Sequence, residues 1–218
     1  MIDYKIDLSN LALIVVGSTR IEETKKAIYY CQSQCSFGIT LYLTEIKNHD
    51  ISNSIQYIAI DSILSKFLYQ IFIIKDFPRI VLPYLNSNIT HALMINWDGF
   101  VVNPQSWNKD FLNYDYIGAP WPWIKNMCGN GGFCLKSKKF LECQYIMLDR
   151  NQNINVEHIP EDIFLSINYR ENFENMKCLY SDASVGYKFS TEYGGYNSHN
   201  SFGFHDFNQN PQFRYLIE

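Results

Sequence analysis

The chain has 218 residues, of which 47% are hydrophobic and 16% aromatic, and this composition excludes a disordered or fibrous protein. Its length suits one domain with a full-sized core, and no repeat or low-complexity linker divides residues 1–218. The formal net charge of -4, without any block of Lys or Arg, argues against a nucleic-acid partner, because that binding rests on neutralising phosphates.

No segment of the sequence predicts passage through a membrane. The apolar run Leu11–Val16 is too short to span a bilayer and lacks a basic leader. In a chain of this size without a leader, the cysteines are expected to be reduced, buried thiols of a cytoplasmic protein. Cys31 and Cys35 lie four residues apart in a predicted helix, so they are not a C-x-x-C redox pair.

The same run, Leu11–Val16, is the first predicted element and is typical of a central parallel strand. Met1–Asn10 before it is polar and predicts a short arm. The helix after it is predicted to begin with a capping box of Thr19 and Glu22 and to reach about Gln34.

Strands and helices then continue to alternate. Residues 37–43 and 55–60 read as strands, a helix is predicted from Ser62, and a further strand begins near Thr90. The apolar stripe of that helix is predicted to comprise Ile63, Leu64, Phe67, Leu68, Ile71 and Phe72. Strand, helix, strand, strand, helix, strand is the pattern of an α/β domain.

Beyond Pro104 the chain is dominated by loops rich in Trp, Tyr, Gly and Pro. A helix is predicted from Ser137, and another begins at Pro160, with proline first and acids in its first turn. Short strands are predicted at residues 185–189 and 202–204.

The most informative segment is Asn96-Trp97-Asp98-Gly99, where an apolar strand breaks into a polar cluster. In α/β folds, ligands bind at the carboxyl ends of strands, and Asp98 would lie there. A hard cation needs one or two carboxylates together with substrate phosphates. The competing interpretation is an Asx turn in which Asp98 bonds only nearby backbone. The tripeptide alone favours the turn.

Two further groups of ionisable residues stand out. Glu161-Asp162 offers carboxylates that could act as a general base, although acids at a helix start also stabilise the helix dipole without any chemistry. A lone histidine such as His205 is more often structural than a ligand. As a metal ligand, His205 would need a carboxylate partner, and Asp98 is the candidate.

Two loops add recognition residues. Gly129–Gly132 is neither a Walker A nor a dinucleotide-binding sequence, but its glycines let backbone approach a ligand, and Asn130 could read sugar hydroxyls. Trp121 and Trp123, held between prolines, suit either a platform for a sugar ring or core packing, and the sequence leaves both open.

In this order the segments resemble successive motifs of one family, a large bacterial group with the character of GT-A glycosyltransferases. The motifs are N-W-D-G-F-V-V-N-P at 96–104, Y-D-Y-I-G-A-P-W-P at 114–122, G-N-G-G-F-C-L-K-S at 129–137, Glu161-Asp162, and F-G-F-H at 202–205. The resemblance extends from the end of the first strand to His205 and is strongest between residues 96 and 137.

The resemblance implies a GT-A-like α/β fold, with a Rossmann-like nucleotide-binding sheet and an acceptor-binding half. It implies a divalent cation, Mn²⁺ or Mg²⁺, at Asp98 and His205. It also implies that Glu161 and Asp162 are catalytic carboxylates, with Asp162 as the general base. Trp121 and Trp123 would hold the acceptor. The residues implied to bind the nucleotide-sugar donor are Gly17, Ser18, Thr19, Arg20, Asp61, Lys66, Asn96, Trp97, Asn130, Gly131 and Gly132. Asn96 departs from the D-x-D pattern of the fold, which leaves the metal role mainly to Asp98.

The implied reaction is inverting transfer of a sugar to a hydroxyl of a glycan or lipid-linked acceptor, in surface polysaccharide biosynthesis. The resemblance implies a cytoplasmic enzyme. Any association with the inner face of the membrane would be made through a partner or the acceptor lipid. Two alternatives stay open: a sugar nucleotidyltransferase, for which the Gly17–Arg20 segment is a poor phosphate loop, and an inactive carbohydrate-binding subunit, which Asn96 favours.

Overall fold

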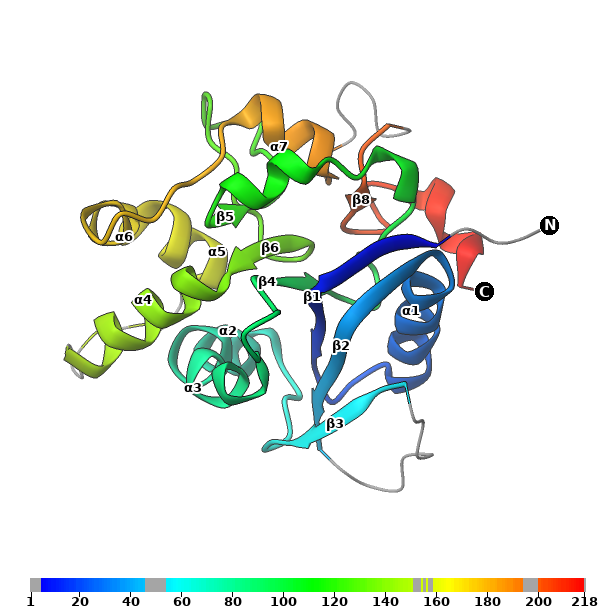
Figure 1. Cartoon of the computed structure of the whole chain (residues 1–218), viewed down its shortest axis with the longest axis horizontal. Helices are drawn as coiled ribbons and strands as arrows, with labels where there is room; N and C mark the ends of the chain where they lie inside the picture. The colour runs from blue at the N-terminus through cyan, green and yellow to red at the C-terminus, as the bar shows by residue number, and fades with distance from the viewer. Residues whose placement is uncertain are drawn as a thin grey trace.

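The centre of the protein is a six-stranded mixed sheet in the order β3-β2-β1-β4-β6-β5 (Figure 1). The computed structural model describes residues 5–45, 54–150, 154, 156, 159–193 and 200–217. The strands of this sheet are β1 (Ile6–Val16), β2 (Cys35–Thr44), β3 (Gln56–Ala59), β4 (His91–Ile95), β5 (Tyr116–Ile117) and β6 (Cys134–Ser137). β1 pairs in parallel with β2 and β4, whereas β6 runs antiparallel to both β4 and β5.

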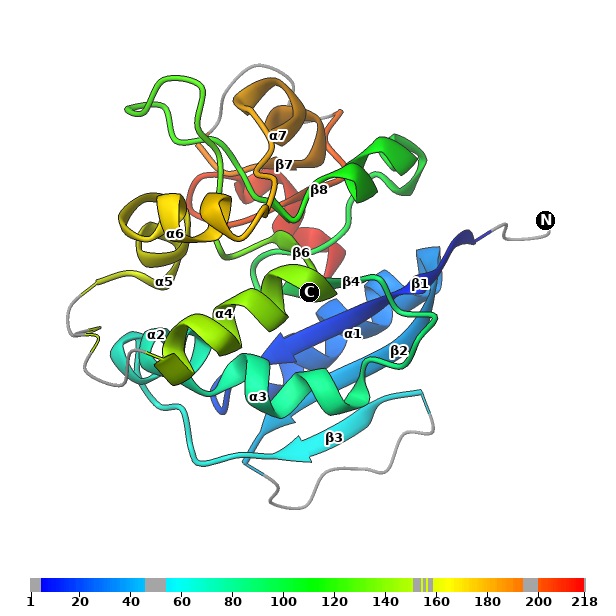
Figure 2. The same ribbon diagram turned by 60° about the vertical axis from the view of Figure 1, so that its left-hand side comes forward.

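Helices cover both faces of the sheet (Figure 2). They are α1 (Ile21–Gln34), α2 (Lys66–Lys75), α3 (Phe77–Val81), α4 (Lys138–Arg150), α5 (Glu161–Ile163), α6 (Arg170–Asn175) and α7 (Ala183–Phe189). A π-helical segment, Phe164–Asn168, joins α5 to α6, and a second, parallel pair of strands comprises β7 (Ser190–Thr191) and β8 (Gly203–Phe204).

The alternation of side chains along β1 divides the core into two layers. Ala12, Ile14 and Val16 face the layer formed with α2, α3 and α4, while Leu13 and Val15 face the layer formed with α1 and the C-terminal aromatic residues. Because both faces of the second half of β1 are buried, Leu11–Val16 is a continuous apolar run, as a central parallel strand requires.

Most predicted elements are confirmed, including the central strand, the helix ending at Gln34 and the helix after Ser137. The predicted arm is wrong within the described residues, because β1 already begins at Ile6 and pairs with Cys35 of β2. All six cysteines are free thiols, although Cys35 lies in β2 and not in the helix.

Three local predictions are wrong. The Thr19–Glu22 capping box does not form, since α1 begins after Arg20, which has left-handed backbone angles and makes no side-chain cap. Residues 185–189 form helix α7 and not a strand, because the Asp182 carboxylate accepts a hydrogen bond from the Val185 N–H and caps that helix.

The third wrong prediction is the start of α2, which begins at Lys66 and not at Ser62. The Ser65 hydroxyl caps this helix by accepting a hydrogen bond from the Leu68 N–H. Its buried residues are Gln70, Ile73 and Ile74, whereas Phe67 and Leu68 from the predicted stripe are exposed. The predicted face was therefore shifted around the helix.

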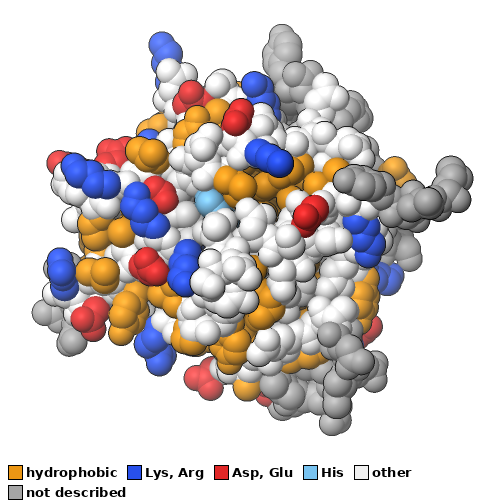
Figure 3. All heavy atoms as spheres, in the orientation of Figure 1, with side chains coloured by type: hydrophobic (Ala, Val, Ile, Leu, Met, Phe, Trp, Pro, Cys, Tyr) orange, Lys and Arg blue, Asp and Glu red, His pale blue; other side chains and the backbone are white. Residues whose placement is uncertain are grey.

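The surface in Figure 3 carries interspersed Lys or Arg and Asp or Glu side chains, with apolar side chains between them. Within the described ranges, no helix combines the length and the apolar character needed to cross a bilayer.

Candidate active site

A cleft of about 720 Å³ opens where β1 and β4 end, between the sheet and the loops that follow β5, α4 and β7. Thirteen of the residues singled out in the sequence line it: Gly17, Thr19, Lys66, Asn96, Trp97, Asp98, Trp121, Trp123, Asn130, Gly132, Glu161, Asp162 and His205. Residues from both halves of the chain therefore meet in one cavity.

Four of the singled-out residues lie outside this lining. The Ser18 hydroxyl accepts a hydrogen bond from the Ile63 N–H at 3.0 Å and so joins the end of β1 to the segment before α2. The Arg20 guanidinium lies 4.3 Å from the centre of the Trp97 ring. Asp61 lines a separate depression beside α2 and α3. Gly131 is next to Glu161, because a Cβ on Gly131 would lie 2.8 Å from Oε1 of Glu161.

The segment after β4 is a tight turn that projects Asp98 into the cleft. Asn96 and Gly99 exchange two backbone hydrogen bonds, of 2.8 and 3.2 Å. The carbonyl of Asp98 accepts from the Asp206 N–H at 2.9 Å, while its carboxylate faces His205. The segment is thus a turn, and it also directs the Asp98 carboxylate toward His205.

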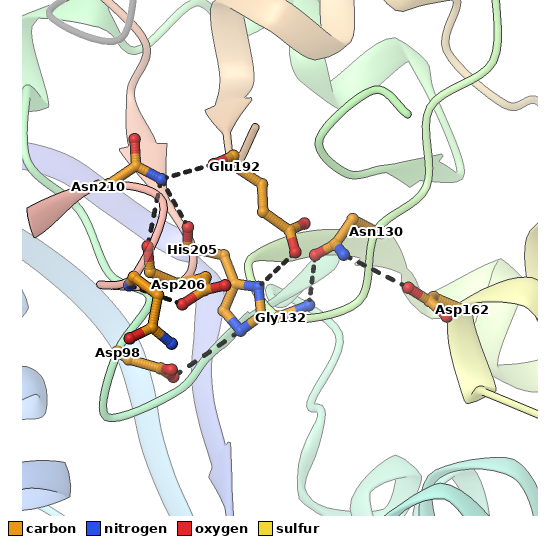
Figure 4. Close-up of polar contacts among 9 residues, drawn as sticks. Asp98, Asn130, Gly132, Asp162, Glu192, His205, Asp206 and Asn210 are labelled. Atoms are coloured by element: carbon orange, nitrogen blue, oxygen red, sulfur yellow. Dashed lines mark hydrogen bonds and ion pairs between the residues drawn. The ribbon is translucent and has the colours of Figure 1, made fainter. Parts of the chain in front are cut away.

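His205 lies between two carboxylates, as Figure 4 shows. Its Nε2 is 3.8 Å from Oδ1 of Asp98, and its Nδ1 is 3.4 Å from Oε1 of Glu192. Burial lowers the pKa of His205, but Glu192, Asp98 and Asp206 outweigh burial, so the pKa is raised. Burial raises the pKa of Asp98, partly opposed by His205.

Two glycines from different motifs make room for the His205 ring. A Cβ on Gly132 would lie 2.2 Å from Cδ2, Cε1 and Nε2 of the ring, and a Cβ on Gly99 would lie 2.9 Å from Cδ2. Real Cβ atoms essentially never approach heavy atoms so closely, so any side chain at Gly132 would displace the ring. The glycine loop therefore serves His205 directly.

The Asn210 side chain, which is fully buried, fixes the backbone of this region. Its Nδ2 donates to the carbonyls of Glu192 at 2.8 Å, His205 at 2.9 Å and Asp206 at 3.3 Å. One amide thus joins the segment after β7 to the segment after β8 (Figure 4).

On the other side of the glycine loop, Asn130 orients Asp162. The Asn130 Oδ1 accepts from the Gly132 N–H at 3.0 Å, and its Nδ2 is 3.4 Å from Oδ2 of Asp162. Oδ1 of Asp162 accepts from the Ile163 N–H at 2.8 Å. Asn130 is therefore engaged in fixing the loop and the acid.

The two adjacent acids are buried together. Burial, followed by repulsion from Asp162, raises the pKa of Glu161 to about 7, with Lys136 and Lys66 opposing. Burial also raises the pKa of Asp162, and Lys66 again opposes the shift. A carboxyl group with a pKa near neutrality suits proton transfer at physiological pH.

Carboxyl groups outnumber basic side chains in the lining of the cleft. The described lining contains five carboxylates, from Asp98, Glu161, Asp162, Glu192 and Asp206, against Lys66 and His205. An anionic ligand such as a diphosphate would be repelled by this set unless a cation accompanied it.

Asp98 supplies the carboxylate oxygen that Mn²⁺ and Mg²⁺ prefer, and His205 adds an imidazole nitrogen, a donor for transition-metal ions more than for Mg²⁺. Oδ1 of Asp98 and Nε2 of His205 lie 3.8 Å apart, so the two donors face each other in the cleft. Over the described ranges, no three His, Cys, Asp or Glu side chains form a metal-binding group. The residues therefore fit an ion whose remaining ligands come from substrate or water.

The two tryptophans have different environments. Trp121 is 3% exposed, with its ring against Gly129, whereas Trp123 is 63% exposed and packs edge-to-face on Tyr193 at 4.8 Å. Both line the cleft, and the ring of Trp123 is by far the more accessible to a ligand.

Six polar or aromatic residues of the lining were missed in the sequence: Ser65, Tyr69, Glu192, Tyr193, Asp206 and Asn208. Asp206 follows His205 directly, but nothing in the local sequence marks the Glu192-Tyr193 pair.

Comparison with known proteins gives a family and a fold. A family model described as "Protein of unknown function (DUF5672)" matches residues 84–205. The search of curated proteins found no match.

Among solved structures, the fold is similar to that of a glycosyltransferase involved in the glycosylation of the major capsid of PBCV-1, with a TM-score of 0.55 and 13% identity over 94% of this chain and 98% of the other. It is also similar to the apo-form glycosyltransferase GlyE of Streptococcus pneumoniae TIGR4, with a TM-score of 0.52 and 12% identity over 89% of this chain and 53% of that one. The predicted GT-A-like α/β fold is thereby confirmed.

Proposed function

The chain belongs to the DUF5672 family, and from its fold and the residues of its cleft we propose that it is a glycosyltransferase acting on a nucleotide-sugar donor. The observation that carries the proposal is the meeting, in one cleft, of Asp98 and His205 with the Glu161-Asp162 acids. Fold alone does not define function, so the proposal depends on these side chains.

The donor is a nucleoside diphosphate sugar. Lys66 is the lysine of the described lining, and it opposes five carboxylates there. One lysine does not balance both the cleft and a diphosphate, so a divalent cation would accompany the donor, and Asp98 and His205 would hold it. When bound, such an ion neutralises the charge that develops on the departing diphosphate.

Asp162 acts as the general base. It lines the cleft, and Asn130 and the Ile163 N–H fix its carboxylate. The acceptor hydroxyl oxygen forms a bond to the anomeric carbon while the bond from that carbon to the diphosphate oxygen breaks. Asp162 takes the hydroxyl proton, and the nucleoside diphosphate leaves with the bonding electron pair. A single displacement of this kind inverts the anomeric carbon.

The acceptor is a glycan or a lipid-linked glycan, in the biosynthesis of a surface polysaccharide at the inner face of the membrane. Trp123 and Tyr193 form an aromatic wall at the cleft that suits the apolar face of a sugar ring. Trp121 also lines the cleft but is 3% exposed, so the acceptor would meet mainly Trp123.

A sugar nucleotidyltransferase is less well supported. Such an enzyme would use the segment after β1 to hold a triphosphate, but the Ser18 hydroxyl is engaged by the Ile63 N–H and Arg20 lies over Trp97. An inactive carbohydrate-binding subunit would have the same fold, so only an experiment distinguishes it from an active transferase.

The test is titration calorimetry with nucleoside diphosphates, with and without Mn²⁺ or Mg²⁺, followed by assays of donor hydrolysis. We expect one nucleotide to bind in a cation-dependent way and its sugar conjugate to be slowly hydrolysed. Binding without hydrolysis or transfer would identify an inactive binding subunit. No cation-dependent binding of any nucleotide would refute the proposal.

A further inference from the structure

Glu192 is a buried carboxylate that neither the motifs nor the proposed reaction uses. It is 7% exposed, and its Oε2 is buried with no hydrogen-bond partner among the described residues. Burying a carboxylate costs free energy unless its contacts compensate, so the place of Glu192 in the fold needs a reason.

The local pairing of strands places Glu192 beside His205. β7 and β8 run in parallel, with Thr191 opposite Phe204, so that the next residues along both strands are Glu192 and His205. The His205 N–H donates to the Thr191 carbonyl at 2.9 Å, and the Asn210 amide joins the carbonyls of Glu192 and His205. The backbone thus fixes the two side chains as neighbours.

The contact between them is specific to one ring nitrogen. Oε1 of Glu192 approaches Nδ1 at 3.4 Å, whereas Nε2 on the other side of the ring faces Asp98 (Figure 4). Nδ1 is buried and makes no hydrogen bond to the described residues at this distance, so Oε1 is the acceptor that faces it. Gly132 and Gly99 lie against the ring and leave it little room to turn.

We propose that Glu192 is the positioning residue of His205: its carboxylate accepts the Nδ1–H and so leaves the Nε2 lone pair facing Asp98 and the cleft. The value of this arrangement rests on the proposed function, in which Nε2 binds the cation. Histidines that bind metals generally donate their other N–H to a carboxylate or carbonyl, which fixes the tautomer.

Glu192 is not itself a third ligand. Its carboxylate lies at the Nδ1 side of the ring, and across the part of the chain that is described no three such side chains form a metal-binding group. Its effect on a cation therefore passes through the orientation and tautomer of His205.

The first test needs no substrate and no metal. A two-bond ¹H–¹⁵N correlation spectrum of the metal-free protein, at a pH where His205 is neutral, reports which ring nitrogen carries the proton. The signal is assigned by its loss in His205→Ala. We expect Nδ1–H in the wild type and in Glu192→Gln, whose amide oxygen accepts the same bond, and a shift toward Nε2–H in Glu192→Ala.

Asp206→Asn is the matched control. Asp206 is a neighbouring acid that raises the pKa of His205, but its carboxylate accepts a hydrogen bond from the Asn208 N–H and not from the His205 ring. The tautomer should not change in this variant. A wild-type ring protonated on Nε2, or a Glu192→Ala spectrum identical to the wild type, would overturn the proposal.

The second test measures free Mn²⁺ by electron paramagnetic resonance. Loss of such a partner typically weakens metal binding by about 10–100-fold, so we expect a loss of this size in Glu192→Ala and a smaller one in Glu192→Gln. If the wild type shows the Nδ1–H tautomer and yet binds no Mn²⁺, Glu192 positions His205 but the metal role in the proposed function is wrong.

Discussion

The ring of His205 lies directly against the backbone of Gly132, with room for a hydrogen atom and not for a methyl group between them. A Cβ at this position would fall 2.2 Å from Nε2. The neighbouring Gly131 has a different partner, since its Cβ would lie 2.8 Å from Oε1 of Glu161. Two adjacent glycines therefore protect two different functional groups.

Gly132→Ala should displace His205 and weaken Mn²⁺ binding by at least tenfold, about 1.4 kcal/mol. Gly131→Ala is the matched control: it crowds the flexible end of Glu161 and should leave Mn²⁺ affinity within about threefold of wild type. Calorimetric titration with Mn²⁺ compares them. Equal losses in both variants would contradict the separate roles of the two glycines.

Asp162→Asn should abolish transfer, because an amide cannot take the proton from the hydroxyl of the acceptor. Nucleotide binding should stay close to that of the wild type. General-base catalysis contributes roughly 10²–10⁴-fold to the rate, and a loss in that range is expected. Product formation is followed with the donor identified by calorimetry. Turnover within a few-fold of wild type would show that Asp162 is not the base.

Glu161→Gln should stabilise the metal-free protein above neutral pH. The pKa of Glu161 is raised from 4.5 to about 7, so the folded state binds a proton more tightly than the unfolded state. Stability from this group is fully present at low pH and is lost as pH rises from about 4.5 to about 7. One pKa unit is worth about 1.4 kcal/mol, so the loss is up to roughly 3 kcal/mol.

The measurement is the melting temperature of both proteins across pH in a chelating buffer. The variant should match the wild type near pH 4 and exceed it increasingly up to about pH 7, with a constant gap above. A variant that melts below the wild type at alkaline pH would show that the buried carboxylate stabilises the fold.

Lys66→Met should weaken nucleotide diphosphate binding about tenfold or more, because hydrogen bonds to charged groups contribute roughly 1.5–3 kcal/mol. Lys75→Met, at the opposite end of α2 and outside the cleft, is the control and should bind normally. Calorimetry with the preferred nucleotide and Mn²⁺ gives both constants. Unchanged affinity in Lys66→Met would place the diphosphate elsewhere.

The two tryptophans should separate stability from acceptor use. Trp121→Ala removes a ring that is 3% exposed and should destabilise the fold by about 3–5 kcal/mol. Trp123→Ala removes an exposed ring and should cost at most about 1.5 kcal/mol. Its expected effect is a higher KM for the acceptor with unchanged donor hydrolysis. Reduced donor hydrolysis would place Trp123 at the donor instead.

The sequence was sufficient to predict elements whose pattern is local. The Leu11–Val16 part of β1 is recognisable because a strand segment buried on both faces must be apolar at every position. Asp98 is recognisable because a polar cluster follows the apolar run of β4. The start of α2 was missed because Ser65 outcompetes the earlier residues as a cap.

The remainder depends on contacts between distant segments. Glu192 is part of the cleft only because β7 pairs with β8, and Asn130 turns toward Asp162 only in the folded chain. Trp121 and Trp123 differ in exposure by a large factor although they lie two residues apart. No local pattern encodes these relationships.

Asn210 lies five residues beyond the segment that the family model matches, and β1, β2 and β3 all precede it. A protein trimmed to residues 84–205 would keep every motif and lose both the sheet that supports them and the amide that holds Glu192 and His205 together. Screens that express only the shared segment of related chains would therefore score them as inert, whatever the intact proteins do.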